Sequence, residues 1–245
     1  MSAFPYELSN DPQPVLGLIV LQVDETIEQD FRRIFPPELA KLHVTRIPSG
    51  EELTPDTIAT MEGTLPAAAR LLPQAARFDA VGYGCTSGTT LIGAPRVHAL
   101  VGAEVDTAAV TDPLSAALAA MRALGLRRIG VVSPYVESVA GPIKRAFEAA
   151  GFAVPATLSF GEEVEARVAR IDPASISAAA GEVAGRAQVD GVFLSCTNLR
   201  TLDIIAPLEA KLGVPVLSSN QVLGWQMARM AGLPVPAWMG RIADV

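Results

Sequence analysis

The stretch Asp79-Ala-Val-Gly-Tyr-Gly-Cys85-Thr-Ser-Gly-Thr-Thr-Leu91 has a counterpart later in the chain, Asp190-Gly-Val-Phe-Leu-Ser-Cys196-Thr-Asn-Leu-Arg-Thr-Leu202. Both stretches follow the pattern Asp-x-Val-x-x-x-Cys-Thr-x-x-x-Thr-Leu. A weaker similarity pairs Leu16-Gly-Leu-Ile-Val with Ile129-Gly-Val-Val-Ser. Because self-similarity within a chain indicates a repeated structural unit, the sequence predicts two similar halves with one cysteine at the same place in each.

Short β-branched runs alternate with longer Ala-rich stretches of helical period. The expected strands are 16–23, 42–47, 80–83, 129–132, 191–194 and 214–217. The expected helices are 55–72, 94–101, 114–124, 139–150, 174–187, 201–212 and 221–230. This alternation predicts an α/β fold of two similar parallel-sheet halves, related by a pseudo-twofold axis, with the active site in the cleft between them. We expect residues 1–112 plus 217–245 to form the first half and residues 113–216 the second.

Composition and charge exclude several classes of protein. Of the 245 residues, 50% are hydrophobic and 18% are charged, which is enough apolar material for a sizeable core. A net charge of −7 without any basic run argues against a nucleic-acid partner. The apolar run 15–21 is too short to span a bilayer and follows no basic segment, so we expect no membrane partner and a cytoplasmic location. The sequence is compatible with a homo-oligomer.

The sequence contains no motif for a cofactor or a metal ion. No Gly-x-Gly-x-x-Gly follows the first strand, and neither a Walker-type Gly-Lys-Ser/Thr nor a ligand cluster of His and Cys is present. Two cysteines are too few for a disulfide framework, and a reducing compartment leaves both as thiols. We therefore expect chemistry without cofactor or metal.

Each cysteine follows an apolar strand and precedes Thr, Ser or Asn residues that suit a helix N-cap. Cys85 and Cys196 are thus expected at the carboxyl ends of parallel strands, where α/β sheets bind ligands, on opposite sides of one cleft. Helix N-termini at that edge suit a substrate carboxylate and favour a thiolate. There are two alternatives to a catalytic role. The two cysteines are small buried hydrophobic residues, or their thiols form a regulatory disulfide.

A thiolate on one side of a substrate and a thiol on the other suit two reactions. In racemisation, one sulfur removes a proton from the carbon next to a carboxylate, and the other returns a proton to the opposite face. In cis–trans isomerisation, one thiolate adds to a double bond and the other thiol protonates the neighbouring carbon, which allows rotation. The matched positions of the two cysteines favour such a catalytic role over the structural one.

The motifs Gly-Cys85-Thr-Ser-Gly, Ser-Cys196-Thr-Asn-Leu and Ser133-Pro134-Tyr135 resemble those of the Asp/Glu racemase superfamily, in the branch of maleate cis–trans isomerase and arylmalonate decarboxylase. The resemblance covers nearly the whole chain. It implies two catalytic cysteines and a small carboxylate substrate. The decarboxylases keep only the second cysteine, so the presence of both favours isomerisation. The substrate-binding residues that the resemblance implies are Thr86, Ser87, Tyr135, Thr197 and Asn198.

Two loops depart from the family pattern. Where maleate isomerases carry Pro-Ser-Ser-Asn-Thr after the first strand, this chain has Leu21-Gln-Val-Asp24-Glu-Thr26, which aligns Asp24 with a substrate-binding asparagine. The later loop Gly161-Glu-Glu-Val-Glu165-Ala-Arg-Val is also acidic. Carboxylates repel a dicarboxylate and attract an ammonium group, so we expect Asp24 to bind a nitrogen-bearing substrate. As an alternative, Asp24 is only a helix N-cap. A looser resemblance is to members of this branch associated with ectoine utilisation.

These observations predict a cofactor-independent, two-cysteine isomerase of small carboxylic acids. The first expectation is a racemase or epimerase of an amino or acylamino acid, and the alternative is a maleate cis–trans isomerase with a covalent cysteine adduct. A hypothesis from another class is a non-catalytic two-lobed ligand-binding module, because such modules also place two α/β halves around a cleft.

Overall fold

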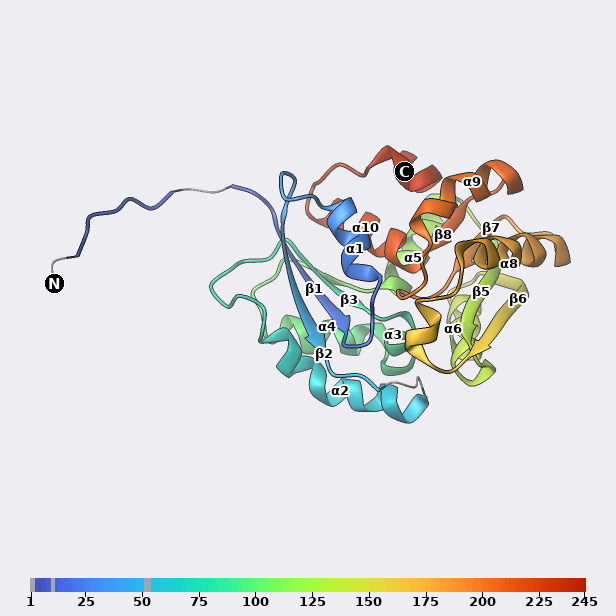
Figure 1. Cartoon of the computed structure of the whole chain (residues 1–245), viewed down its shortest axis with the longest axis horizontal. Helices are drawn as coiled ribbons and strands as arrows, with labels where there is room; N and C mark the ends of the chain where they lie inside the picture. The colour runs from blue at the N-terminus through green and yellow to red at the C-terminus, as the bar shows by residue number, and fades with distance from the viewer. Residues whose placement is uncertain (1–2, 10–11, 51–53) are drawn as a thin grey trace.

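The computed structural model describes residues 3–9, 12–50 and 54–245. Within these ranges the strands form two four-stranded parallel sheets (Figure 1). The first sheet, in the order β2-β1-β3-β4, contains β1 (Val15–Leu21), β2 (Lys41–Ile47), β3 (Ala80–Gly84) and β4 (Val110–Thr111). The second, in the order β6-β5-β7-β8, contains β5 (Arg128–Tyr135), β6 (Ala153–Glu162), β7 (Gly191–Leu194) and β8 (Val216–Ser218). The predicted α/β fold of two similar parallel sheets is confirmed.

The first residue of the repeated pattern, Asp79 in one stretch and Asp190 in the other, has the same structural role in both sheets. Asp79 Oδ2 accepts a hydrogen bond from the backbone N–H of Val15 at 2.8 Å, at the start of β1. Asp190 Oδ2 accepts one from the backbone N–H of Arg128 at 2.9 Å, at the start of β5. Each aspartate therefore fixes the beginning of the central strand beside the strand that leads to a cysteine.

Helices cover the sheets and connect the strands. The helices of the first part of the chain are α1 (Ile27–Ile34), α2 (Pro55–Ala69), α3 (Thr86–Ile92), α4 (Ala94–Gly102) and α5 (Pro113–Ala123). They are followed by α6 (Glu137–Ala149), α7 (Glu165–Val168), α8 (Pro173–Arg186), α9 (Leu202–Leu212), α10 (Ser219–Met230) and the 3-10 helix η1 (Ala237–Asp244). In the described part of the chain, no helix has the length and apolar character needed to cross a membrane.

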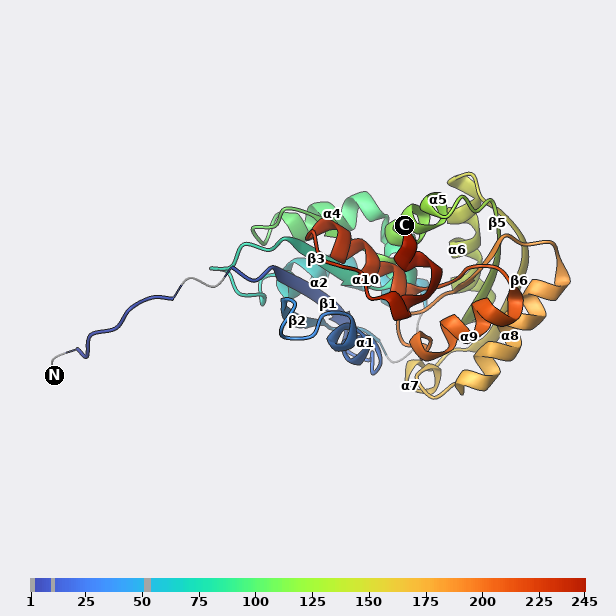
Figure 2. The ribbon, with the colours of Figure 1, turned by 90° about the horizontal axis from the view of Figure 1, so that it is seen from above.

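The chain returns to the first sheet after β8, as Figure 2 shows for α10 beside β3. A Cβ atom added at Gly82 in β3 would lie 2.6 Å from Met227 Sδ, so glycine permits this close approach. One at Gly224 would lie 2.6 Å from Ile34 Cδ1 in α1. The helix α10 thus packs between β3 and α1 while its first residues stay at the end of β8. The division of the chain at residues 112 and 216 stays a prediction.

Candidate active site

The thiol of Cys85 lies where β3 ends and α3 begins. Cys85 has extended backbone angles and is the N-cap of α3, and its Sγ accepts a hydrogen bond from the backbone N–H of Gly88 at 3.1 Å. A Cβ atom at Gly88 would lie 2.8 Å from Sγ and 2.7 Å from the hydroxyl oxygen of Tyr83. The first turn of α3 can therefore close around the sulfur only with glycine at this position. The predicted helix N-terminus at Cys85 is present.

Cys196 lies at the corresponding end of β7 but in a different local structure. Its φ angle is 151°, a region that side chains other than glycine rarely adopt. No helix begins at this cysteine, because the next one, α9, starts only at Leu202. The helix that the sequence predicts over 201–212 is present as α9. The Sγ atom of Cys196 accepts from the backbone N–H of Asn198 at 3.2 Å and lies 2.7 Å from the Tyr135 hydroxyl.

Hydrogen bonds join the two cysteine motifs across the boundary between the sheets. The Ser219 hydroxyl, at the start of α10, accepts from the backbone N–H of Cys196 at 3.0 Å and lies 2.9 Å from the Thr86 hydroxyl. The Thr197 hydroxyl donates to the carbonyl oxygen of Gly84 at 3.4 Å. The residue after Cys85 and the amide of Cys196 thus share one serine, which brings the two buried cysteine motifs together.

Two carboxyl groups, Asp24 and Glu165, are buried beside the thiols. Asp24 Oδ1 accepts from the backbone N–H groups of Thr26 and Ile27, at 2.8 Å each, and so supports the start of α1. Glu165 Oε2 accepts from Asn198 Nδ2 at 3.0 Å. The other oxygens, Asp24 Oδ2 and Glu165 Oε1, are buried and have no hydrogen-bond partner in the part of the chain that the structure describes. Asp24 and Glu165 are only 3% and 2% exposed.

Burial raises the pKa of both carboxyl groups. The pKa of Glu165 rises from 4.5 to about 7, first because of desolvation and then because of the charge of Asp24. Desolvation also raises the pKa of Asp24, against the lowering effects of the Ile27 N–H, the Thr197 hydroxyl and the Thr26 N–H. The Thr197 hydroxyl is close enough to act on Asp24 but is directed to Gly84. The Tyr135 hydroxyl likewise lowers the pKa of Glu165 while it contacts Cys196.

Burial also raises the pKa of both thiols. The pKa of Cys85 rises to about 11, because desolvation outweighs the Ser87 hydroxyl and the Gly88 N–H. The pKa of Cys196 rises well above its ordinary value through desolvation and the charges of Glu165 and Asp24. The predicted preference for a thiolate is therefore wrong for the site without a ligand. The charge of Glu165 contributes to the raised pKa of both thiols.

The predicted substrate-binding side chains lie at this site, although their roles stay predictions. Ser87 Oγ is 3.6 Å from Cys85 Sγ, and Thr86, Thr197 and Tyr135 make the contacts given above. Asn198 is engaged with the protein: its Oδ1 accepts from the backbone N–H of Glu25 at 2.9 Å, and its Nδ2 donates to Glu165. Asn198 therefore connects the two acidic loops.

Sequence reasoning missed Ser219 and did not place Glu165 among the site residues. The polar run Ser218-Ser219-Asn220-Gln221 follows β8, and polar residues at the carboxyl end of a parallel strand are a signal for a ligand site. Ser218 and Gln221 form a capping box that fixes the start of α10 and thereby positions Ser219. The signal for Glu165 was the acidic loop 161–168, which did not distinguish this residue from Glu162 and Glu163; in the structure Glu165 is the first residue of the short helix α7.

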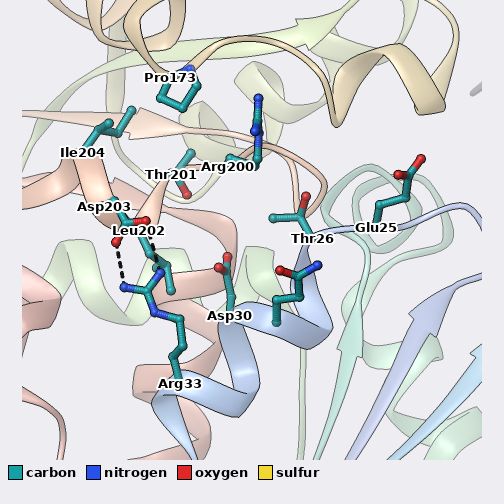
Figure 3. A pocket seen from close by; sticks show the side chains of 11 residues that line it. Glu25, Thr26, Asp30, Arg33, Pro173, Arg200, Thr201, Leu202, Asp203 and Ile204 are labelled. Atoms are coloured by element: carbon teal, nitrogen blue, oxygen red, sulfur yellow. Dashed lines mark hydrogen bonds and ion pairs between the residues drawn. The ribbon is translucent and has the colours of Figure 1, made fainter.

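A separate cavity of about 240 Å³ opens at the surface between α1 and the start of α9. Figure 3 shows Thr26, Asp30 and Thr201 around it, with the ion pair of Arg33 and Asp203 at one side. Asn220 Nδ2 donates to Asp30 Oδ2 and to the carbonyl oxygen of Thr197, at 2.7 Å each. The wall of this cavity is therefore connected to the loop that holds Cys196, but neither cysteine lines it.

The model of the arylmalonate decarboxylase family matches residues 96–243. The chain belongs to the arylmalonate decarboxylase family. It is 32% identical to an arylmalonate decarboxylase of Bordetella bronchiseptica, over 89% of this chain and 91% of that protein. The predicted branch, which joins maleate isomerases and arylmalonate decarboxylases, is thus confirmed.

Solved structures of this branch have the same fold. A mutant of arylmalonate decarboxylase in its liganded form superposes with a TM-score of 0.85 at 26% identity, covering 95% of this chain and 99% of that chain. A mutant of the maleate cis–trans isomerase of Nocardia farcinica, with a covalently bound succinylcysteine intermediate, gives a TM-score of 0.81 at 23% identity, covering 94% and 98%. These relatives are enzymes, one a decarboxylase and one an isomerase.

Proposed function

We propose that this protein is a cofactor-independent isomerase of small carboxylic acids, with Cys85 and Cys196 as its two acid–base groups. One observation carries the proposal: two buried thiols lie at equivalent strand ends, one in each sheet, and their motifs are joined through Ser219, which contacts the amide of Cys196 and the hydroxyl of Thr86. A structural role would not require both cysteines to lie at the ligand-binding edge of their sheets.

Racemisation or epimerisation of an amino or acylamino acid is the first candidate reaction. One sulfur, as thiolate, takes the proton from the carbon next to the substrate carboxylate, and the electron pair moves onto that carboxylate. The other thiol then delivers its proton to the opposite face of the same carbon. The hydroxyl groups of Thr86, Ser87 and Thr197 and the N–H groups at the start of α3 are the neutral donors that would hold the carboxylate.

The nature of Asp24 supports a nitrogen-bearing substrate. A second substrate carboxylate next to this acid would be repelled, whereas an ammonium or amide N–H would be attracted. The N-cap alternative accounts for Oδ1 but leaves Oδ2 without a partner.

A maleate-type cis–trans isomerisation is the second candidate. It is supported by the covalently bound succinylcysteine of the structurally similar maleate isomerase, in which a cysteine carries the substrate. In such a reaction one thiolate adds to the double bond, the bond rotates, and elimination restores the thiolate.

A substrate panel tests the proposal. The wild type, Cys85→Ser and Cys196→Ser are incubated with both enantiomers of amino acids and N-acylated diamino acids, with maleate, and with arylmalonates. We expect the wild type to isomerise at least one compound and each variant to lose net isomerisation. Turnover of arylmalonates alone would identify a decarboxylase, full activity of either variant would remove that cysteine from the mechanism, and binding without turnover would identify a binding module.

A further inference from the structure

The most unusual feature of the site is a pair of unpartnered carboxyl oxygens. Asp24 Oδ2 and Glu165 Oε1 are both buried without a hydrogen-bond partner among the described residues, while the second oxygen of each group is well bonded. A buried acceptor without a donor destabilises the fold. Two such acceptors beside two candidate catalytic thiols indicate a site that is completed by a donor from outside the chain.

The surroundings of the pair show which charge that donor carries. The titratable groups that interact with the pair are Tyr135, Asp30 and the two thiols, none of which is cationic, and Arg46. Arg46 is already engaged, because its guanidinium donates to backbone carbonyl oxygens of the loop after β1 and pairs with Glu28. The two carboxyl groups repel each other, and the charge of Asp24 raises the pKa of Glu165. A proton or a cation can relieve this repulsion.

We propose that Asp24 and Glu165 together form the subsite for a protonated nitrogen of the substrate, and that a proton held by this pair in the free protein is released when the nitrogen binds. The inference rests on the proposed function only in taking the thiol site as the substrate site. The cation donates to Asp24 Oδ2 and Glu165 Oε1, and the released proton goes to solvent. The exchange leaves the net charge of the occupied subsite unchanged, since one positive charge replaces another.

This subsite also links binding to the chemistry of the thiols. The charges of Glu165 and Asp24 disfavour a thiolate at Cys196, and that of Glu165 does so at Cys85. With a cation between the two carboxylates, the thiols are exposed to the same net charge as in the protonated free site, so the substrate can bind without a further penalty on the thiolate. A ligand without a positive charge that left both carboxylates ionised would expose the thiols to one more negative charge.

Calorimetric titration near pH 7, in two buffers with different ionisation enthalpies, tests the inference. The probes are 2-aminobutanoate, 4-aminobutanoate and butanoate, which differ in the presence and position of the nitrogen. We expect one of the two aminobutanoates to bind at least about tenfold more tightly than butanoate, since hydrogen bonds to charged groups contribute about 1.5–3 kcal/mol. Its binding should release protons, whereas butanoate should be bound without release or with uptake.

Isosteric variants distinguish a loss of ligand binding at the subsite from a loss of folding. In Glu165→Gln the side-chain oxygen can still accept from Asn198, and in Asp24→Asn it can still accept from the N–H groups of α1. Each variant should lose the tenfold preference, and Glu165→Gln should lose the proton release. Glu163→Gln, a change of an exposed neighbour, is the matched control and should behave as the wild type.

Several results would overturn the inference: butanoate binding as tightly as both aminobutanoates, no binding of either aminobutanoate, or unchanged proton release in Glu165→Gln. The turnover of the cysteine variants, compared with the binding preference, distinguishes a failure of the inferred subsite from a failure of the proposed function. If the preference persists while Cys85→Ser retains full turnover, the two-thiol mechanism is wrong and the subsite stands. If the preference is absent while both cysteine variants are inactive, the inferred subsite is wrong and the two-thiol mechanism stands.

Discussion

The side chains around the two sulfurs show how one site can be predicted in part from sequence. The cysteines were found through the repeated pattern, because Cys85 and Cys196 follow strands that end at the same kind of sheet edge. The resemblance and the change of an amide to an acid singled out Asp24. Glu165 lies far from both cysteines in sequence, and only the packing of α7 against the end of β6 brings it to the site. Its burial, and hence its raised pKa, is a tertiary property that no local pattern encodes.

The first prediction at this scale concerns stability and Glu165. Its pKa is higher in the folded protein, about 7 against 4.5, so the folded state binds more protons between these values and loses stability as pH rises through that range. Glu165→Gln cannot ionise. It should be more stable than the wild type at pH 8, by up to about 3 kcal/mol, and nearly equal to it below pH 4.5. Urea unfolding across pH measures this, and an unchanged pH slope in the variant would mean that burial does not hinder the ionisation of Glu165.

A second prediction concerns substrate preference and Asp24. Asp24→Asn keeps the acceptor for the start of α1 but removes the charge, so it should shift kcat/KM from nitrogen-bearing acids towards maleate by about tenfold or more. Asp172→Asn is the control, because Asp172 caps α8 in the same way through the N–H of Ala174. If the wild type prefers maleate and Asp24→Asn leaves the ratio as it was, Asp24 is only a helix cap.

Among the helices and strands, those with a clear pattern of apolar residues were predicted best. The apolar strands that lead to the cysteines, β3 and β7, were predicted within one residue. The strand β6 was missed, because Pro155 and Gly161 interrupt it and its exposed positions alternate with buried ones, as at a sheet edge. The start of α3 at Cys85 agrees with the cap residues in the sequence, but its range lies outside the predicted helices, since its polar sequence has no apolar periodicity.

The start of α3 gives a prediction for Gly88. Its close contacts with Cys85 Sγ and Tyr83 mean that Gly88→Ala must displace the sulfur or the tyrosine, at a cost of about 1–3 kcal/mol, and it should lower kcat more than KM. Gly181→Ala in α8 is the control, because its added Cβ meets no atom within 4 Å and alanine favours a helix interior. Thermal unfolding and kinetics measure both. A Gly88→Ala protein with normal kcat would show that the position of Cys85 Sγ is not critical.

At the scale of the whole molecule, the two sheets are held together above the buried site by their loops. Thr26 Oγ1 donates to the carbonyl oxygen of Asn198 at 2.9 Å, and Arg170 pairs with Glu25 at 2.8 Å. Both cysteines are only 2% exposed, so we expect these loops to separate when a substrate enters. The sequence predicts that two halves meet around the thiols. It does not predict that their loops cover the thiols, because that depends on single contacts between residues far apart in the chain.

Hydrogen exchange followed by mass spectrometry tests this opening. Amides of residues 22–26 and 162–168 should exchange faster than those of β1 and β5, and a bound ligand should slow them. Arg170→Ala should speed exchange of residues 22–26 and leave β1 unchanged. Arg186→Ala, which removes an exposed ion pair with Glu182 within α8, should have no such effect. Exchange in both loops as slow as in the central strands would contradict entry by this route.

The central claim is that the two thiols act from opposite sides on one carbon of one substrate. Its most direct test uses a racemised substrate from the panel, offered as each pure enantiomer to Cys85→Ser and Cys196→Ser in deuterated water. We expect that neither variant inverts the substrate, that each exchanges the hydrogen of only one enantiomer, and that the two variants select opposite enantiomers. Exchange of the same enantiomer by both variants, or continued inversion by either of them, would contradict it.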